Sequence, residues 1–389
     1  MTNGTDPIDQ IQQLIDNTRD YYVTNNNADN MVIAVGVVTP DAPQGQFLFT
    51  GPTTLNNASS PSQPITLDEN TQFEIGSCSK LFTSSIYYMR QHADYLGTLG
   101  EKIGPLSNSP IAGLSIGDIA FYRSGFWQDN DGDPYRPSNP SADLAALFKY
   151  WNSNSTPYQP GTCYTYSNLS WSLMAMAALQ VDNDDTEAFV TNYNKQLQAF
   201  FNMGSGLTQV YKDPLLANIP AAYTQKWSPL TQSQYRPCPF VRYGSGGIVS
   251  NTNDMLLFLL YNMGVFNPDF TMVTLQQKAA LSSTSCMGGS RIFKTGHAWF
   301  HQSFETQNGA VDVLWKDGGV TGFTSWIDFP SWVEIGTPAQ NGVVVLTNTH
   351  VADCIGHQAM NILLGNSTQA CDAQAVAASI ARINYETPD

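Results

Sequence analysis

The chain has 389 residues, of which 42% are hydrophobic and only 13% are charged, and its formal net charge is -15. This length and hydrophobic content allow a large buried core in one or two domains. The excess of negative charge repels phosphate, so no nucleic-acid or anionic-membrane partner is expected. No run of 18 apolar residues is present, so the sequence predicts no transmembrane segment.

The start of the chain lacks the basic head and the apolar stretch of a signal peptide. We therefore expect either a cytoplasmic protein or a secreted, extracytoplasmic one whose leader has been removed, with the second favoured. Asn-X-Ser/Thr triplets fit a secreted eukaryotic protein, although a chain rich in Asn contains some by chance. Examples of such triplets begin at Asn3, Asn57, Asn154 and Asn366.

The cysteines are far apart and show neither C-x-x-C pairs nor the histidine spacing of a zinc site. In a chain of this length, buried thiols are favoured over a disulfide framework. We therefore expect free thiols and no structural metal. The six residues are Cys78, Cys163, Cys238, Cys286, Cys354 and Cys371.

Apolar residues recur at helical spacing over residues 7–22, which predicts an amphipathic first helix. Residues 31–40 and 45–51 are rich in β-formers and predict a hairpin. A helical pattern then begins at Ser77 and runs to His92. Three more helices are expected over residues 141–151, 169–180 and 185–201, separated by long polar loops.

The end of the chain changes character, because residues 312–319, 323–330 and 341–350 alternate like strands and residues 354–365 like a helix. Strands at both ends with helices between them predict an α/β (α+β) fold. It would consist of an antiparallel sheet built from both chain ends, flanked by helices, with a mostly helical insertion. We assign residues 1–78 and 245–389 to the sheet domain and 79–244 to the helical domain, with an active site at their junction.

Ser77 and Lys80 are three residues apart where the helical pattern begins, so their side chains share one face of a helix. A hydroxyl, an amine that can take its proton and an N–H at a helix start together suit acyl transfer. The spacing alone is a weak signal, since a surface lysine on an ordinary helix explains it equally well.

A second candidate motif is Tyr166-Ser167-Asn168, which follows a Pro-Gly turn and precedes an apolar helix. A tyrosine beside a lysine can relay protons, although a buried tyrosine with a capping asparagine is the simpler explanation. Tyr150-Trp151-Asn152 repeats the pattern without the turn, at a helix end, and is ranked lower.

The third candidate is Lys316, which ends a strand pattern and is followed by Asp317, Gly318 and Gly319. Glycines there allow a substrate to approach the strand edge, and the lysine supplies a fixed positive charge. Competing lysines before a glycine are Lys294 and Lys102.

Together, "FEIGSCSKLFT", "PGTCYTYSN" and "KDGGVTGF" resemble the three motifs of the serine β-lactamase and penicillin-binding protein superfamily. The nearest branch holds class C β-lactamases, D-alanyl-D-alanine carboxypeptidases and related esterases. The segments "LSIGDIAFYRSGF" and "GSGGIVSNTNDMLLFLL" are also similar, so the resemblance spans about residues 30–365. Motif order favours Lys316 over Lys294.

The resemblance implies roles for these residues. Ser77 would be the nucleophile, Lys80 its activating partner, and Tyr166 the group that exchanges protons with the leaving group and then with water. The backbone N–H groups of Ser77 and Gly319 would form the oxyanion hole. Asn168 would bind Lys80 or the substrate amide, and Lys316, with Gly318 beside it, would bind substrate.

One departure from the family pattern affects the substrate. Asp317 replaces the hydroxyl residue of the third motif, and its carboxylate would repel the carboxylate of a β-lactam. We therefore expect a serine hydrolase of the esterase or peptidase type, without cofactor or metal, with weak or no β-lactamase activity. It would act on a small-molecule or peptide acyl substrate. A biosynthetic acyltransferase and a penicillin-binding sensor without turnover are the alternatives, and the oligomeric state is unknown.

Other residues were considered as metal ligands or pocket walls. Asp129, Asp131 and Asp133 do not match the EF-hand spacing and are expected in a solvated loop. His297 and His301 would share a face only in a helix, whereas "GHAWFHQ" reads as strand or loop. Most tryptophans are expected in the core, although one or two near the motifs could line an acyl pocket; the nearby ones are Trp127, Trp315 and Trp326.

Overall fold

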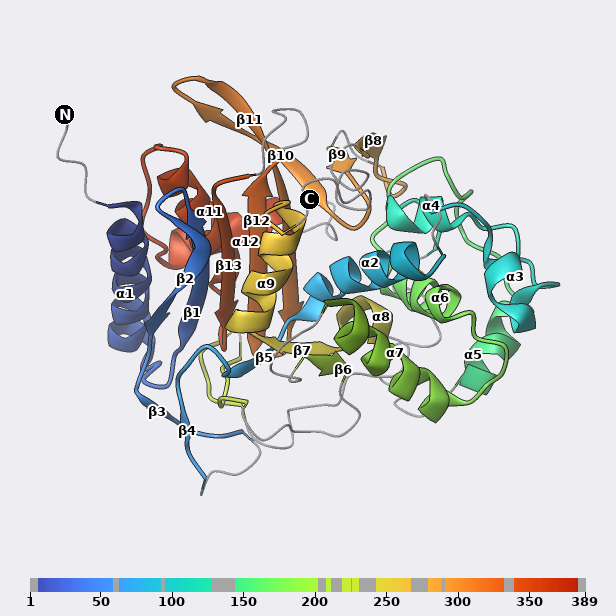
Figure 1. Cartoon of the computed structure of the whole chain (residues 1–389), viewed down its shortest axis with the longest axis horizontal. Coiled ribbons are helices and arrows are strands. Elements are labelled where there is room, and N and C mark those ends of the chain that lie inside the picture. The colour runs from blue at the N-terminus through green and yellow to red at the C-terminus, as the bar shows by residue number, and fades with distance from the viewer. Residues whose placement is uncertain are drawn as a thin grey trace.

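An eight-stranded antiparallel sheet organises one side of the molecule, with strand order β2-β1-β13-β12-β11-β10-β9-β8 (Figure 1). The structure is a computed structural model that describes residues 6–58, 63–91, 95–126, 144–201, 208–210, 219–224, 226–230, 243–266, 279–288, 291–331 and 339–383. Both chain ends supply strands to the sheet. The strands are β1 (Ile33–Thr39), β2 (Ala42–Thr50), β8 (Leu281–Thr284), β9 (Ile292–Thr295), β10 (Phe300–Thr306), β11 (Gly309–Val320), β12 (Phe323–Pro330) and β13 (Gly342–Thr347).

The central strands read as continuous apolar runs because helices cover both faces of the sheet. Every residue of β1 is buried, and Val35 pairs with Leu48 of β2 on one side and Val345 of β13 on the other. Strands that are covered on both faces lack the alternation of a one-sided sheet. Each fully buried valine or leucine contributes roughly 1.5–3 kcal/mol to stability.

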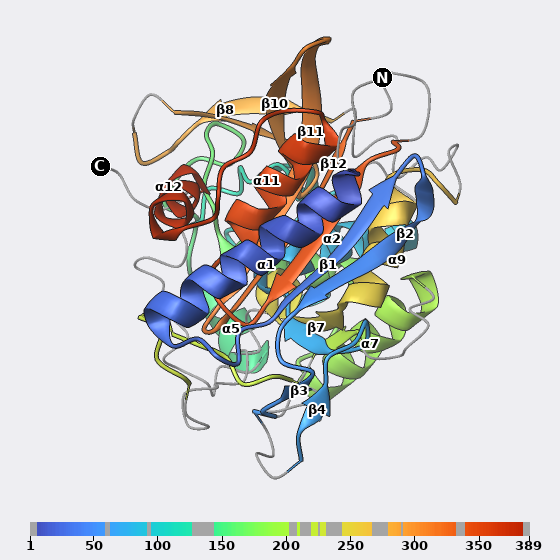
Figure 2. The same cartoon turned by 90° about the vertical axis from the view of Figure 1, so that its left-hand side faces the viewer.

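Helices α1, α11 and α12 lie over one face of the sheet, and α9 lies on the other (Figures 1 and 2). Helix α1 begins after Asp6, whose carboxylate accepts a hydrogen bond from the Ile8 N–H at 2.9 Å and caps the helix. Its apolar stripe, which includes Ile11 and Ile15, is buried. The bounds of these helices are α1 (Pro7–Asn26), α9 (Thr252–Asn262), α11 (Ala352–Leu363) and α12 (Ala373–Ile383).

The other side of the molecule is mainly helical and is connected to the sheet through a short three-stranded sheet, β5-β7-β6 (Figure 1). Its longer helices are α2 (Ser79–Gln91), α5 (Leu144–Trp151), α6 (Asn168–Leu179) and α7 (Thr186–Phe201). Its shorter helices are η1 (Gly76–Cys78), α3 (Leu99–Lys102), η2 (Gly104–Leu106), α4 (Ile116–Ala120) and α8 (Tyr243–Gly246). The remaining strands are β3 (Thr54–Leu55), β4 (Ile65–Thr66), β5 (Gln72–Glu74), β6 (Gln209–Val210) and β7 (Ile248–Asn251).

The predicted fold class is confirmed, and the predicted helices and strands agree with the structure to within a few residues wherever it describes them. Residues 92 and 141–143, which the sequence assigns to helices, lie outside the described residues. The sequence analysis did not predict several elements, among them β3, β4, β6, β8, β9 and α12. The domain limits proposed above remain a prediction.

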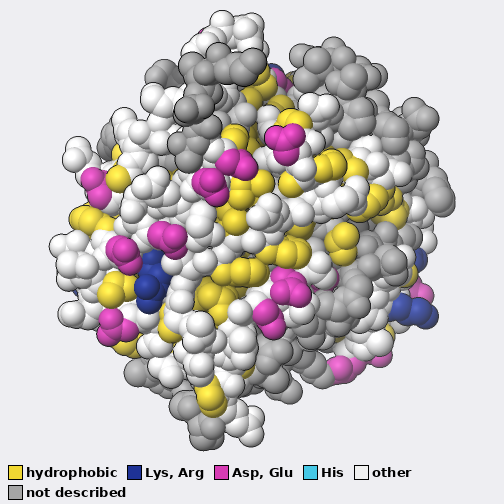
Figure 3. All heavy atoms as spheres, turned by 60° about the vertical axis from the view of Figure 1, so that its left-hand side comes forward, with side chains coloured by type: hydrophobic (Ala, Val, Ile, Leu, Met, Phe, Trp, Pro, Cys, Tyr) yellow, Lys and Arg dark blue, Asp and Glu magenta, His cyan; other side chains and the backbone are white. Residues whose placement is uncertain are grey.

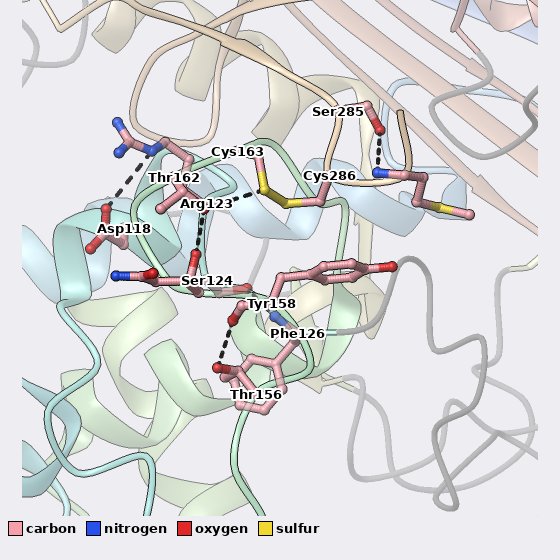
Figure 4. The surroundings of a disulfide bond; sticks show 12 residues. Asp118, Arg123, Ser124, Phe126, Thr156, Tyr158, Thr162, Cys163, Ser285 and Cys286 are labelled. Atoms are coloured by element: carbon pink, nitrogen blue, oxygen red, sulfur yellow. Dashed lines mark hydrogen bonds and ion pairs between the residues drawn. A yellow bond between two sulfur atoms is a disulfide. The ribbon is translucent and has the colours of Figure 1, made fainter. Parts of the chain in front are cut away.

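The expectation of free thiols is wrong for four cysteines. Disulfides join Cys163 to Cys286 and Cys354 to Cys371, whereas Cys78 is a buried free thiol and position 238 lies outside the described residues. Cys163 and Cys286 are 123 residues apart, so sequence spacing gave no sign of their pairing. A bridge between the neighbouring Tyr164 and Ser285 brings them together. Figure 4 shows the disulfide between Cys163 and Cys286.

Acidic side chains are scattered over the face shown in Figure 3 while basic ones are few, as the net charge of -15 requires. Within the described part of the chain, none of the helices combines the length with the apolar run that crossing a membrane requires.

Candidate active site

Ser77 lies in the tight turn η1 between strand β5 and helix α2. Gly76, directly before it, has φ +47°, a conformation that favours glycine. The backbone oxygen of Ile75 accepts a bond from the Cys78 N–H at 3.1 Å, which closes the turn. Ser77 keeps part of its surface exposed, whereas Cys78 and Lys80 are fully buried. The turn therefore presents the serine hydroxyl at the surface of a rigid, buried corner.

The buried amino group of Lys80 lies within hydrogen-bond distance of three oxygen atoms. Nζ donates to Ser77 Oγ at 2.8 Å, to Asn168 Oδ1 at 2.7 Å and to the backbone oxygen of Ser245 at 2.8 Å. These residues come from η1, the start of α6 and α8, which are distant in sequence. A buried amine needs such partners because an unsatisfied one is costly. The network fixes Lys80 beside Ser77.

Tyr166 completes a triad around the serine oxygen. Its Oη donates to Ser77 Oγ at 2.6 Å, and its ring lies 4.7 Å from Lys80 Nζ and 5.5 Å from Lys316 Nζ. Burial, with added repulsion from Tyr122 and Asp317, raises the pKa of Tyr166 well above its ordinary value. The resting side chain is therefore a neutral phenol that donates a hydrogen bond.

Lys316 is fully buried in β11 and forms an ion pair with its neighbour. Its Nζ lies 2.7 Å from Asp317 Oδ1 and donates to the Asp317 backbone oxygen at the same distance. Asp317 thus accepts a hydrogen bond that Lys316 Nζ could otherwise donate to a ligand. The sequence identified Asp317 as a departure, and the structure shows where its carboxylate lies.

Glycines bring β11 against the Ser77 turn. A Cβ on Gly318 would lie 2.0 Å from the Ile75 oxygen, and one on Gly76 would lie 2.6 Å from the Gly319 nitrogen. Both gaps are too small for a side chain. At Gly319, in contrast, a Cβ would meet nothing within 4 Å, so this face of the strand is open. The Gly319 backbone and the Ser77 turn therefore lie next to one another beside open space.

A cavity of about 740 Å³ opens at Gly319. Lys226, His350 and Asp353 are among its lining residues. Burial raises the pKa of Asp353 well above its ordinary value, with repulsion from Asp317 adding to the shift and attraction to Lys316 opposing it. Its described lining includes Gly319 but not Ser77, Lys80 or Tyr166, so the cavity lies beside the serine.

The sequence missed two contributors to this site. The Ser245 backbone oxygen binds Lys80, and a backbone acceptor leaves no mark in side-chain chemistry. Tyr122 stacks on Tyr166 with ring centroids 5.5 Å apart and an interplanar angle of 12°. Its φ of +58° is rare for a tyrosine, and its Oη donates to the Ala298 oxygen at 2.7 Å. Tyr122 lies in the segment noted for its family resemblance, so position alone could have indicated it.

The lower-ranked candidates lie elsewhere. Lys294 is in β9 and pairs with Asp312 at 3.1 Å, and Tyr150 is near the end of α5. His297 lies in a loop and His301 in β10, so the two do not share a helix. Positions 127, 129, 131 and 133 lie outside the described residues.

A comparison of the chain with known protein families identifies its family. The family described as Beta-lactamase matches residues 34–364, which is most of the chain. The protein belongs to the Beta-lactamase family. The comparison with curated protein sequences found no match.

Solved structures support the same fold. A structure titled beta-lactamase/D-alanine carboxypeptidase from Pseudomonas syringae matches with a TM-score of 0.68 and 17% identity, covering 92% of this chain and 100% of the other. A D-alanine carboxypeptidase AmpC from Burkholderia cenocepacia gives 0.68, 16% identity and coverages of 92% and 99%. A beta-lactamase from Sulfitobacter sp. EE-36 gives 0.64, 18% identity and coverages of 98% and 99%. At these identities the likeness shows the fold.

Proposed function

We propose that this protein is a serine hydrolase that forms an acyl-enzyme on Ser77 and acts on esters or amides, with weak or no β-lactamase activity. The observation that carries the proposal is the triad at Ser77 Oγ, which lies 2.8 Å from Lys80 Nζ and 2.6 Å from Tyr166 Oη. A nucleophile within hydrogen-bond reach of an amine and a phenol is the geometry of covalent acyl transfer.

In the proposed first step, Ser77 Oγ attacks the substrate carbonyl carbon while its proton passes to Lys80 in its amine form. The carbonyl oxygen becomes an oxyanion, which the backbone N–H groups of Ser77 and Gly319 would stabilise. The C–O or C–N bond then breaks, and the departing group receives a proton from Tyr166. The tyrosinate regains a proton from the Lys80 ammonium.

Tyr166 suits the role of acid because its buried phenol is neutral at rest. In the second step water would attack the acyl-enzyme carbonyl and pass a proton to Tyr166, which gives its own proton to the Lys80 amine. As the ester bond to Ser77 breaks, Ser77 Oγ would take a proton back from the Lys80 ammonium. Asn168 holds Lys80 in place through its 2.7 Å hydrogen bond, and no step of the scheme requires a cofactor. Turnover follows when the acid product leaves and Ser77 Oγ regains its proton.

Asp317 is the reason to favour esters or neutral amides over β-lactams. Its carboxylate already occupies Lys316 Nζ at 2.7 Å and places a negative charge where a β-lactam carboxylate would need a cation. An uncharged acyl donor avoids this repulsion. Gly318 would assist by letting β11 pack on the Ser77 turn, which keeps the Gly319 N–H facing the substrate.

The test uses p-nitrophenyl esters, a D-Ala-D-Ala peptide and nitrocefin with wild type and Ser77→Ala. We expect ester or peptide hydrolysis well above nitrocefin turnover, and a loss of about 10⁴-fold in Ser77→Ala. Lys80→Ala and Tyr166→Phe should each lose about 10³-fold or more. Retained fluorophosphonate labelling in Ser77→Ala would disprove the assignment of the nucleophile.

A further inference from the structure

Lys294 and His301 both line a second cavity, of about 460 Å³, on the sheet. His357 of α11 and Ser379 of α12 also line it, so it lies on the sheet face that α11 and α12 cover (Figures 1 and 2). Successive strand residues point to opposite faces. Trp315 lines this cavity while Lys316 points toward Tyr166, so the cavity and Ser77 lie on opposite sides of β11.

The polar wall of the cavity is a fixed array centred on Asp312. This carboxylate accepts from Lys294 Nζ at 3.1 Å and from His301 Nδ1 at 2.8 Å. Burial opposes ionisation of Asp312, but the hydrogen bonds from His301 and Lys294 outweigh it and hold the pKa below its ordinary value. The aspartate is therefore a carboxylate at neutral pH and fixes the orientation of the imidazole ring.

His301 supports the wall of the cavity from behind. Its side chain has no exposed surface, and its Nε2 has no hydrogen-bond partner among the described residues. The bond between Nδ1 and Asp312 holds the ring in place. The imidazole therefore fixes the wall and does not itself reach a ligand.

The charge of the lining selects the ligand further. Arg291 and Lys294 line the cavity and are exposed, whereas Asp312, which binds Lys294 and His301, is not among the described lining residues. Two cations around one opening favour a carboxylate, which the planar guanidinium of Arg291 can bind through two hydrogen bonds.

The remaining wall is aromatic. Trp315 and Trp326 stack with ring centroids 4.8 Å apart and an interplanar angle of 9°, and Phe300 stacks on Trp315 at 5.0 Å. Such a wall buries a flat apolar group well. A basic rim over an aromatic floor, in a volume of the usual ligand-binding size, fits one small molecule.

We propose that this cavity is a second binding site, separate from Ser77, for a carboxylate attached to a planar apolar body. The carboxylate contacts Arg291 and Lys294, and the planar body lies against the tryptophans. Phe300 connects the two sites, because its ring also lies 5.4 Å from Lys316 Nζ and stacks on Tyr122 at 5.0 Å. The inference does not depend on the substrate of the Ser77 site.

The test is calorimetric titration with 2-naphthoate as the probe and 2-naphthamide as its neutral counterpart. We expect saturable 1:1 binding of the acid, at least tenfold weaker binding of the amide, and at least tenfold weaker binding of the acid to Arg291→Gln and Lys294→Gln. Both side chains are exposed, so these variants should keep the wild-type melting temperature. Lys226→Gln, which removes a lysine from the cavity beside Gly319, is the matched control and should bind normally.

Three results would overturn the proposal. Absence of saturable naphthoate binding, or an equal weakening of naphthoate binding by Lys226→Gln, would remove the specific role of Arg291 and Lys294. The third result is loss of binding after Ser77 has been covalently labelled with a fluorophosphonate, since that would place the probe at Ser77. Binding that survives the labelling supports a separate site.

Discussion

Gly76 and Gly319 lie so close that a Cβ added to Gly76 would be 2.6 Å from the Gly319 nitrogen. Residues of two distant segments, the turn before α2 and the end of β11, are thereby held side by side. In the proposed mechanism both segments supply an oxyanion-hole N–H, so their separation decides how well the oxyanion is stabilised. The contact between Gly76 and Gly319 should therefore affect both the stability of the fold and the proposed catalysis.

Gly76→Ala should therefore lower both stability and activity. The new methyl group must displace β11, and the φ of +47° strains any side chain. We expect a loss of about 1–3 kcal/mol in unfolding free energy and about 10²-fold in kcat on an ester, measured by urea denaturation and steady-state kinetics. Gly104→Ala is the control, because a Cβ there meets nothing within 4 Å. Equal effects in both variants would contradict the argument.

Asp317→Thr should move the specificity toward β-lactams. The substitution removes the carboxylate that binds Lys316 Nζ at 2.7 Å and supplies a hydroxyl, so the ammonium becomes available to an anionic substrate. We expect kcat/KM for nitrocefin to rise about tenfold or more, which corresponds to about 1.4 kcal/mol. Hydrolysis of a neutral ester should change less.

Asp317→Asn separates charge from hydrogen bonding at the same position. It removes the repulsion but keeps a polar side chain next to Lys316, so its nitrocefin turnover should fall between wild type and Asp317→Thr. If all three proteins hydrolyse nitrocefin equally while ester turnover is intact, Asp317 does not control the choice of substrate.

His297 should contribute to the pH dependence of the unfolding free energy. Burial lowers its pKa to about 3, and its ring stacks on Tyr95 with centroids 3.9 Å apart. Below pH 6.5 the unfolded chain binds a proton that the folded chain does not, so this contribution destabilises the fold as pH falls from 6.5 to 3. Integrated over that window, the loss is roughly 4 kcal/mol.

His297→Phe keeps the stacking and removes the titrating group. Other groups also titrate in this window: burial lowers the pKa of His350 and raises those of Asp328 and Asp353, and the two aspartates act in the opposite direction. The informative quantity is therefore the difference between wild type and variant, measured by urea denaturation at pH 7 and pH 4.5. A constant difference across these pH values would contradict the assignment.

How much of the site could be predicted depends on how local each relationship is. Ser77 and Lys80 lie within one turn of chain, so their spacing is visible in the sequence. The grouping of Tyr166 with them followed from motif order and family resemblance. The Ser245 oxygen, the stacking of Tyr122 and the approach of Asp353 depend on tertiary contacts between distant segments, and residue types do not reveal these.

The same distinction between local and tertiary signals applies to the secondary structure and the disulfides. Strand β1 was predictable because seven buried residues in a row are apolar or small, whereas β9 is four residues long with an exposed lysine and an exposed isoleucine. Short edge strands of mixed character carry little periodic signal. Cys163 and Cys286 were misassigned because only the folded chain brings them together.

The Cys163–Cys286 disulfide should support the position of Tyr166, three residues after Cys163. Around it, the Tyr164 N–H donates to the Thr284 oxygen at 2.8 Å and the Cys286 N–H donates to the Tyr164 oxygen at 2.9 Å. The disulfide therefore connects the tyrosine segment to the end of β8. A closed loop of this length contributes roughly 3–5 kcal/mol to stability in the chain-entropy model. We therefore expect replacement of both cysteines by serine to lower the melting temperature and to reduce kcat.

Replacement of Cys354 and Cys371 by serine is the matched control. This second disulfide spans 17 residues between α11 and the start of α12, and neither of its cysteines is in the Tyr166 segment, so its loss should lower stability without the same loss of kcat. Activity is measured below both melting temperatures, where each variant is folded. If the two variants lose kcat equally, the disulfide at Cys163 stabilises the protein without positioning Tyr166.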